Sequence, residues 1–354
     1  MEAGVIALLK IILKKQENLH RKTIVMNKLL SIIVPVYNTQ DYLTRCLDSL
    51  CTPQYLEQIE VIVVIDGSPD QSITIANRYK EKYPGTFIVI DKENGGHGSA
   101  INVGIKLAQG KYVRILDSDD WFDEKNFPVF IERLTKEDED LVMTHTVKEY
   151  TGKCEPFVQK IKEHNTTYKV EDIIDRITDT SFAMSRCTYK TARLREHGLV
   201  LLENQSYDDG ILHVFPLVFL KSFNCYDMVI YHYFLERPEQ SVHQKKTLRL
   251  CKHHENVLDQ RIELYNKYKN IIPEKNANFI KNEIKNLADI LYVMFNDLEY
   301  KEAKKELKRY NKKILSAGNK EFLGVKGRYY NAVPYSIFRL TKKIYEIIYP
   351  ILHS

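Results

Sequence analysis

The chain contains few of the features that mark secreted, zinc-binding or membrane-spanning proteins. Its six cysteines are far apart in the sequence, with no CxxC pair and no cysteines and histidines at zinc-ligand spacing. The sequence therefore predicts neither a disulfide framework nor a zinc site, and it fits a protein of the reducing cytoplasm. No apolar run approaches the roughly 18 residues that are needed to cross a bilayer, so we expect no membrane-spanning helix.

Repeats, low-complexity tracts and long linkers rich in glycine or proline are also absent from the sequence. With 44% hydrophobic and 28% charged residues among 354, the composition is that of a folded enzyme or binding protein. The first 25 residues hold a short apolar stretch that Lys10 interrupts, without a small-residue cleavage site, which disfavours a signal peptide. Because Met26 stands just before the first predicted strand, we interpret residues 1–28 as an N-terminal extension, either an amphipathic helix or an upstream start.

Short β-branched runs alternate with segments of helical periodicity in the first half of the chain. This pattern predicts an α/β fold with a parallel sheet and crossover helices. The expected strands are 30–36, 60–65, 86–90, 112–116 and 141–147, and the helices between them are 41–51, 71–82, 99–108 and 124–134. Because ligands bind beyond the carboxyl ends of the strands in open sheets of this kind, we expect the functional site there.

The second half of the chain becomes helical towards its end. We expect helices at 170–177 and 210–220, an aromatic strand at 225–235, and then helices at 248–269, 274–298, 300–315 and 333–348. The predicted organisation is therefore an α/β catalytic domain over 29–245 and a helical, basic C-terminal subdomain over 246–354.

Positive charge is concentrated in that C-terminal subdomain. Between residues 301 and 343, thirteen Lys and Arg stand against three Glu, whereas the whole chain carries a net charge of +5. Such a segment can bind an anionic membrane surface, where each basic residue is worth about 1 kcal/mol. A solvated helical face with i,i+4 ion pairs explains the pattern equally well, and pairing of two subunits in a homodimer is a further alternative. No nucleic-acid-binding motif accompanies the charge, so we expect no nucleic-acid partner.

Three carboxylates, Asp117, Asp119 and Asp120, follow directly after the fourth predicted strand. Carboxylates this dense repel one another, and a hard divalent cation such as Mg²⁺ or Mn²⁺, shared with diphosphate oxygens, would compensate for the repulsion. The structural alternative is an acidic turn that caps the next helix. The second predicted strand ends in the same way, at Asp66-Gly67-Ser68, although an ordinary turn explains that segment as well.

A glycine-rich loop, residues 94–100, opens the third predicted helix, where free backbone N–H groups favour anions. It matches neither the phosphate-loop motif GxxxxGK[ST] nor the dinucleotide fingerprint. Within it, His97 fits a structural or capping role as well as a functional one.

Taken in order, these motifs resemble the family 2 glycosyltransferases of the GT-A fold, over residues 29–122. The resemblance rests on Ser31 to Asn38, Asp66-Gly67-Ser68, Asn94-Gly95-Gly96, Asn102 to Ile105 and Asp117-Ser118-Asp119-Asp120. It implies a UDP-sugar donor, with Pro35 and Tyr37 beside the base, Asp66 on uracil or ribose, and Asn94 and Gly95 near the nucleotide. Asp117, Ser118 and Asp119 would form the DxD motif of the donor site, in which Asp119, together with Asp117, would bind Mn²⁺ or Mg²⁺.

The family also places an acidic pair after the DxD motif, at the start of a helix. Residues 204–211 resemble this element, and the resemblance implies Asp209 as the catalytic base with Asp208 as its neighbour; two helix-capping carboxylates are the alternative. Residues 231–243 resemble the Y-x-Y…R-x-x-S element of the family. There Arg237 would neutralise diphosphate charge and His243 would complete the metal shell, unless this is an exposed strand end with a surface histidine.

The resemblance as a whole implies an inverting, metal-dependent glycosyltransferase that moves a hexose or N-acetylhexosamine from a UDP-sugar to a saccharide or lipid-linked glycan acceptor. Residues 29–122 would hold the donor and residues 123–245 the acceptor. Such enzymes serve bacterial capsule, exopolysaccharide or cell-wall glycan synthesis, in the cytoplasm or at the inner face of the plasma membrane. The alternatives are a nucleotide-sugar-binding protein without transferase activity and a nucleotidyltransferase, which would usually carry a glycine-rich basic loop where this chain has Tyr37 to Asp41.

Overall fold

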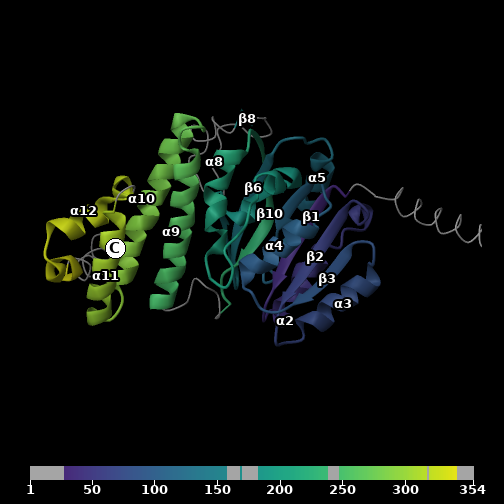
Figure 1. Ribbon diagram of the computed structural model, residues 1–354. Helices are drawn as coiled ribbons and strands as arrows, with labels where there is room; N and C mark the ends of the chain where they lie inside the picture. Colours follow the sequence, from purple (N-terminus) through teal and green to yellow (C-terminus); the bar gives the residue numbers. More distant parts are fainter. Residues whose placement is uncertain (1–27, 158–167, 170–181, 238–246, 317–318, 341–354) are drawn as a thin grey trace, which may run out of the picture.

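The computed structural model of the protein describes residues 28–157, 168–169, 182–237, 247–316 and 319–340. Within these residues the chain forms one mixed sheet with helices on both faces, and further helices stand beside it at one end (Figure 1). The sheet has ten strands in the described residues, in the order β3-β2-β1-β4-β9-β6-β10-β5, with β7 beside β6 and β8 beside β10. The strands are β1 (Leu30–Val36), β2 (Ile59–Asp66), β3 (Phe87–Lys92), β4 (Tyr112–Ile115), β5 (Trp121–Phe122), β6 (Leu141–Tyr150), β7 (Lys153–Phe157), β8 (Tyr168–Lys169), β9 (Cys187–Lys190) and β10 (Ser222–Phe234).

Strands β1 to β4 form the parallel half of the sheet, as the alternating pattern predicts. β1 pairs with β2 from Leu30 opposite Ile59 to Val36 opposite Ile65, and β4 lies on the other side of β1. In the other half of the sheet the predicted strands β6 and β10 also pair in parallel, but the unpredicted β9 runs antiparallel to both β4 and β6. β9 is only four residues long, so the alternation of Cys187 and Tyr189 with polar residues is too short to reveal a strand.

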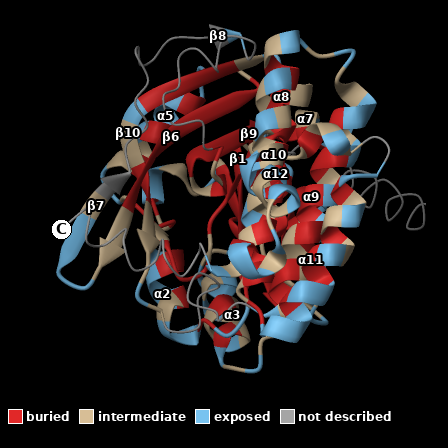
Figure 2. Ribbon diagram, turned by 90° about the vertical axis from the view of Figure 1, so that its left-hand side faces the viewer, coloured by how far each residue is buried: buried red, intermediate tan, exposed pale blue. Residues whose placement is uncertain are grey.

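Two layers of helices cover the sheet. α2 (Gln40–Asp48), α3 (Ser72–Lys82) and α5 (Asn126–Leu134) lie on one face, and α4 (His97–Leu107), α7 (Thr191–Glu196) and α8 (Phe215–Phe219) lie on the other. Successive residues of β1 serve opposite faces: Ile32 and Val34 contact the first layer, and Ile33 contacts the second. Figure 2 shows the buried strands between these layers. The central strands read as nearly continuous apolar runs because both of their faces are covered.

The C-terminal helices are α9 (Leu248–Tyr268), α10 (Glu274–Asn296), α11 (Tyr300–Ile314) and α12 (Val325–Ala332). One hydrophobic cluster runs without interruption from Ile33 in the sheet to Tyr310 in α11, so these helices share a core with the α/β domain. Glu255 of α9 accepts hydrogen bonds from Arg309 (2.6 Å) and Lys313 (2.9 Å) of α11, which ties the outer helices to α9. None of the described helices combines the length and the apolar character that crossing a membrane requires.

Most predicted elements are confirmed to within a few residues, and the helix over 210–220 is not. In place of a helix over 210–220 the chain forms a 3₁₀ helix, η4 (Asp208–His213), and the short helix α8, because Pro216 lacks a backbone N–H at the start of α8. The last predicted helix begins later than expected, at residue 335, because Val333 is extended before Pro334. The predictions missed α7 and α12, and the expected helix over 170–177 lies outside the described residues. The remaining short 3₁₀ helices are η1 (Pro53–Tyr55), η3 (Met184–Arg186) and η6 (Lys320–Phe322).

Candidate functional site

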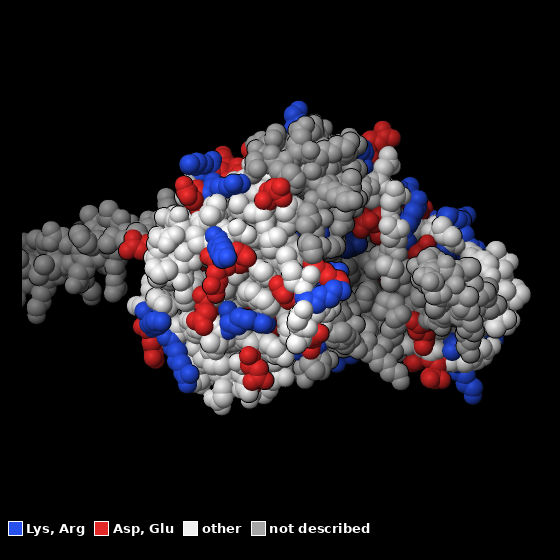
Figure 3. Space-filling model, turned by 180° about the vertical axis from the view of Figure 1, so that it is seen from behind, with Lys and Arg blue, Asp and Glu red and all other residues white. Residues whose placement is uncertain are grey.

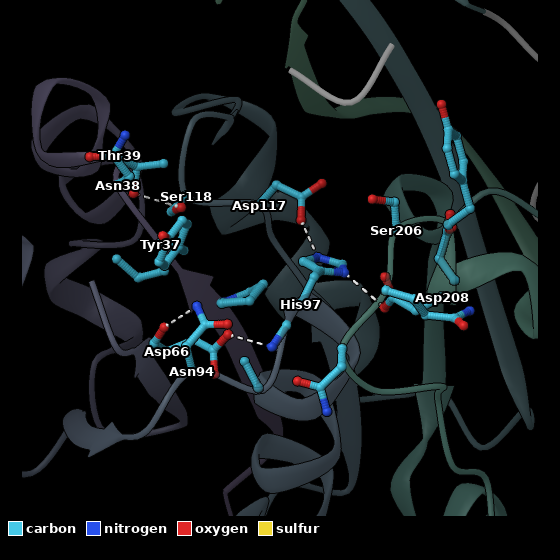
Figure 4. A pocket seen from close by; sticks show the side chains of 18 of the residues that line it. Tyr37, Asn38, Thr39, Asp66, Asn94, His97, Asp117, Ser118, Ser206 and Asp208 are labelled. Carbon is cyan, nitrogen blue, oxygen red and sulfur yellow. Dashed lines mark hydrogen bonds and ion pairs between the residues drawn. The ribbon is translucent and has the colours of Figure 1, made fainter. Parts of the chain in front are cut away.

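A cavity of about 940 Å³ lies at the carboxyl ends of β1, β2 and β4, where the sequence predicts the site. Figure 4 shows side chains from the strand ends, the start of α4 and the loop before η4 converging on it. Three non-glycine residues in the described chain have positive φ, and all three line this cavity: Asn38, Asn204 and Tyr207. Backbone strain of this kind costs about 1–3 kcal/mol for each residue and tends to gather at functional sites.

The predicted site residues lie together in this cavity, with two exceptions. Gly95 does not line the cavity, and His243 lies outside the described residues. The predicted residues that line it are Pro35, Tyr37, Asp66, Asn94, Asp117, Ser118, Asp119, Asp208, Asp209 and Arg237.

One end of the cavity is formed by the residues that follow β1. The Tyr37 side chain is 50% exposed, which leaves its ring face available to a planar ligand. The next residues fix the local backbone, because Thr39 donates a hydrogen bond from Oγ1 to Ser118 Oγ at 2.9 Å. This contact joins the end of β1 to the acidic turn that follows β4.

Asp66 holds the glycine-rich loop in place. Its carboxylate accepts hydrogen bonds from the backbone N–H groups of Gly95 (2.9 Å) and Gly96 (2.7 Å), and Lys92 Nζ lies 2.5 Å from the same group. Asn94 donates its side-chain N–H to the Asp66 carbonyl at 2.8 Å. Asp66 is almost fully buried, so in this geometry its carboxylate serves the loop.

The three carboxylates of the acidic turn after β4 have different contacts. Asp117 Oδ1 faces His97 Nε2 at 2.9 Å, and Asp119 Oδ2 accepts from Arg237 at 3.1 Å. Asp120 is buried and accepts hydrogen bonds from the Tyr231 hydroxyl (2.6 Å) and the Phe234 N–H (2.8 Å). Burial and the charges of Asp119 and Asp117 raise the pKa of Asp120 well above its ordinary value. Asp120 therefore anchors the turn to β10, while Asp117 and Asp119 face the cavity.

The second acidic pair lies at the start of η4, opposite the acidic turn. Asp208 is buried, with Oδ2 3.0 Å from His97 Nδ1. Asp209 is only partly buried and lines the cavity, and no hydrogen bond joins its carboxylate to another described residue. Burial, followed by the negative charge of Asp208, raises the pKa of Asp209 to about 6. A carboxylate with such a pKa, open to a cavity, suits a general base that works near neutral pH.

Helix α9 supports this acidic pair from behind. Arg261 donates two hydrogen bonds to the Gly210 carbonyl, at 2.6 and 3.0 Å, and His253 Nδ1 accepts from the Ser206 N–H at 3.0 Å. The beginning of α9 also lines the cavity, with Arg249 and His253. The C-terminal helices thus contribute to the site, a role that the charge pattern of the sequence did not reveal.

The described residues of the site supply some, but not all, of the oxygen ligands that a hard divalent cation needs. Within the described residues, no group of three or more His, Cys, Asp or Glu side chains could hold a metal ion. Asp117 and Asp119 offer two carboxylates at the cavity. Two carboxylates fit Mg²⁺ or Mn²⁺ if substrate phosphates supply further ligands, which is how Mg²⁺ commonly binds beside phosphates.

His97 is the main contributor that the sequence left undecided. It stands between Asp117 and Asp208 and contacts both (Figure 4). Burial lowers the pKa of His97, but the charge of Asp208 and the hydrogen bonds to Asp117 and Asp208 outweigh it and hold the pKa well above its ordinary value. The only available signal in the sequence was its position directly after Gly95-Gly96, at the start of a helix.

Comparison with known proteins agrees with this geometry. Residues 31–191 match the model of the family described as Glycosyl transferase family 2. Minor teichoic acid biosynthesis protein GgaB of Bacillus subtilis is 42% identical over 98 residues, which are 27% of this chain and 11% of that protein. Glycosyltransferase GlyA of Streptococcus pneumoniae is 36% identical over 114 residues, 32% of this chain and 16% of that protein. The chain thus spans a small part of the length of these two relatives.

A solved structure extends the similarity of fold beyond the matched segment. The crystal structure of S. aureus TarS 1–349 in complex with UDP-GlcNAc has a TM-score of 0.66 to this chain. The match covers 90% of this chain and 91% of that one at 19% sequence identity, so it establishes the fold. From the family match and this similarity we conclude that residues 31–191 belong to the family 2 glycosyltransferases and that the chain has the GT-A fold with a helical C-terminal region.

Proposed function

We propose that this protein is an inverting glycosyltransferase that moves a hexose or N-acetylhexosamine from a UDP-sugar to a saccharide or lipid-linked glycan acceptor. The observation that carries the proposal is the arrangement of one cavity. An exposed tyrosine lies at one end, two carboxylates lie in the acidic turn, and the partly buried Asp209, with a pKa of about 6, faces the same space. These are the parts needed for nucleotide binding, diphosphate departure and proton removal.

The donor would lie across the carboxyl ends of β1 and β2. Tyr37 offers a ring face for the base, and Pro35, Asp66, Asn94 and Ser118 line the same part of the cavity. The TarS structure of the same fold holds UDP-GlcNAc, which supports a UDP-sugar here. Arg237, which binds Asp119 in this structure, would contact diphosphate oxygens.

A divalent cation, Mn²⁺ or Mg²⁺, fits the carboxylates of Asp119 and Asp117. When bound, it would stabilise the negative charge that develops on the departing diphosphate. Asp119 and Asp117 would hold the cation, and Arg237 would then be released from Asp119 toward the diphosphate. His243 remains a candidate for a further ligand.

Asp209 would act as the base in a single displacement. The acceptor hydroxyl oxygen forms a bond to the anomeric carbon of the donor, the hydroxyl proton passes to Asp209, and the bond from the anomeric carbon to the diphosphate oxygen breaks to release UDP. One displacement inverts the anomeric configuration, and it requires no covalent sugar-enzyme intermediate. Asp208, held by His97, would remain beside Asp209 as a fixed neighbour.

The proposed setting is the synthesis of a bacterial surface polysaccharide such as capsule, exopolysaccharide or cell-wall glycan. The relative GgaB, which is named for minor teichoic acid biosynthesis, supports this setting. We further propose that the enzyme works in the cytoplasm at the inner face of the plasma membrane, with the exposed lysines of α11 on anionic lipid. Pairing of two subunits through the same helices is the competing arrangement.

A thermal-shift screen of nucleotide sugars, with and without Mn²⁺, tests the proposal directly. A UDP-sugar with Mn²⁺ should raise the melting temperature more than the corresponding ADP- or GDP-sugar does, because ligand binding to the folded state stabilises it by mass action. UDP release from the best ligand should then stop in EDTA and return when Mn²⁺ is added in excess. Undiminished release in EDTA would refute the metal role, and stabilisation without any UDP release would favour a binding protein.

A further inference from the structure

His97 is the one described residue whose side chain contacts both acidic motifs of the site. Its Nε2 lies 2.9 Å from Asp117 Oδ1 in the acidic turn after β4, and its Nδ1 lies 3.0 Å from Asp208 Oδ2 at the start of η4. Figure 4 shows the imidazole ring between the two carboxylates, with a dashed line to each. The two aspartates are 91 positions apart in sequence (117 and 208), so this ring joins two separate segments of the chain.

An imidazolium ring suits this position for a geometric reason. It carries one N–H on each ring nitrogen, so a single rigid side chain can donate to two carboxylates on opposite sides. Without a cation between them, Asp117 and Asp208 would repel each other across a partly buried space. A glutamine amide carries both of its N–H groups on one nitrogen, so it cannot donate to carboxylates on opposite sides as the two ring nitrogens do.

The glycines on each side of His97 allow this close approach. Gly96 has φ of +85°, a conformation that residues with a side chain rarely adopt. A Cβ atom on Gly98 would collide with the Leu202 carbonyl and lie 2.9 Å from Asp208 Oδ2. Because of these glycines, the first turn of α4 packs closely against the loop that leads to Asp208.

We propose that His97 is a positioning residue that sets the separation between the donor-side carboxylate Asp117 and the acceptor-side loop that carries Asp208 and Asp209. This inference rests on the proposed function, in which Asp209 removes the acceptor proton. His97 itself takes no part in bond making. By holding Asp208, it fixes the place of the adjacent Asp209 relative to the donor.

The electrostatic surroundings of Asp209 give this proposal a second consequence. The charged groups that act on Asp209 are Asp208 on its own element, His97 from α4, Asp117 after β4 and Arg261 from α9. The negative charge of Asp209 in turn contributes to the raised pKa of three tyrosines: Tyr189, Tyr207 and Tyr233. Removing His97 takes away a group that lowers the pKa of Asp209 and leaves Asp208 without this contact, so the pKa of Asp209 should rise.

The first experiment compares His97→Gln with Asn102→Ala. Asn102 lies one turn further along α4 and joins it to Leu201 by two hydrogen bonds of 2.9 Å, but it contacts neither aspartate. With UDP-GlcNAc and Mn²⁺ as the probe, His97→Gln should lower kcat of UDP release about 10- to 100-fold, as expected for a misplaced catalytic group, with KM within about threefold of wild type. The acidic limb of its pH profile should move to higher pH. Asn102→Ala should lower the melting temperature while the pH profile stays in place.

Unchanged kcat and an unmoved acidic limb in His97→Gln would overturn the proposal, as would equal effects of the two variants. If the wild type itself releases no UDP from UDP-GlcNAc, the choice of donor in the proposed function is wrong. The role of His97 can then be tested by a measurement that needs neither donor nor metal. NMR of the metal-free protein labelled with ¹⁵N-histidine provides it. Asp208→Asn should shift the Nδ1 signal of His97 most, and Asp117→Asn should shift the Nε2 signal most. If either substitution leaves the His97 signals unchanged, the bridge does not exist.

Discussion

Asp209 illustrates at the scale of a single residue how burial prepares a side chain for chemistry. Its carboxylate is partly buried beside the negative charge of Asp208, and both effects raise its pKa to about 6. A base with this pKa is ionised at neutral pH yet still holds a proton strongly enough to accept one from a hydroxyl group. An ordinary exposed aspartate, with a pKa near 3.9, would be a weaker base.

Asp209→Asn should abolish sugar transfer and leave UDP binding nearly unchanged, because the amide cannot accept the acceptor proton. For the wild type, turnover should fall as pH drops through about 6, where Asp209 becomes protonated. Steady-state kinetics across pH 5 to 8, with UDP binding measured by calorimetry, check both points. Substantial turnover by the variant would remove Asp209 from the mechanism.

The same variant should be more stable than the wild type at neutral pH. The pKa of Asp209 in the folded state is above its value in the unfolded state, so the folded protein binds the proton more tightly, and this contribution to stability is lost as pH rises through 6. Replacing the carboxylate by an amide removes the cost of about 1–3 kcal/mol that the ionised form carries at pH 7 and above. Denaturation by urea at pH 7.5 and at pH 4 tests this, since the gain should vanish at the lower pH.

At the scale of secondary-structure elements, α9 belongs to the site as much as the strand ends do. It supports the segment that carries the acidic pair through Arg261, and it lines the cavity with its first turn. Val257 lies so close to Gly210 that a Cβ atom on this glycine would collide with it. The C-terminal helices therefore help to hold Asp209 in position, although none of them carries a residue of the predicted donor site.

Arg261→Met should lower kcat more than it raises KM, because η4 would lose the two hydrogen bonds that Gly210 accepts from α9. Loss of these two charge-assisted hydrogen bonds to the buried Gly210 carbonyl should cost about 1–3 kcal/mol in the free energy of unfolding. Glu263→Gln, an exposed change two residues away on the same helix, is the matched control and should alter neither quantity. If both variants behave as the wild type does, α9 has no part in positioning the acidic pair.

At the scale of the whole molecule, one hydrophobic core joins the sheet to the C-terminal helices. Leu307, Tyr310 and Ile314 of α11 are fully buried in the same cluster as Ile33 of β1. Deleting α11 would therefore expose the core and confuse any test of membrane binding. Figure 3 shows basic and acidic side chains mixed over one face of the molecule. The exposed basic side chains of α11 are Lys301, Lys304, Lys305, Lys308 and Lys312.

Charge reversal on α11 provides the cleaner test. The double variant Lys304→Glu/Lys308→Glu should bind vesicles that contain phosphatidylglycerol at least roughly 30-fold more weakly, because each basic residue near an anionic surface is worth about 1 kcal/mol. Lys80→Glu/Lys125→Glu makes the same change in net charge at exposed positions of the α/β domain and should bind as the wild type does. Equal binding by all three proteins would contradict the membrane proposal. Loss of a dimer instead, measured by light scattering, would support pairing of subunits.

The sequence by itself determined the parallel half of the sheet and the residues that lie at its carboxyl edge. Strands β1, β2 and β4 are largely apolar runs. The residues at the end of such a buried strand must lie at the edge of the sheet, so Asp66 and Asp117 could be placed from local pattern alone. Acidic residues there had few structural explanations, and their order along the chain suggested the family. The helical periodicity of apolar residues also predicted α2, α3, α4 and α5, whereas α7 and α8 were not predicted as they are.

Only the tertiary structure decided what joins the two halves of the site. The antiparallel β9, the support of Asp208 and Asp209 by α9, and the place of His97 between two aspartates all depend on contacts between segments far apart in sequence. A single histidine after two glycines has no periodicity and no spacing that reveals its partners. Its importance follows from the close approach of α4 to η4, which is set by the packing of the whole chain and not by any local run of residues.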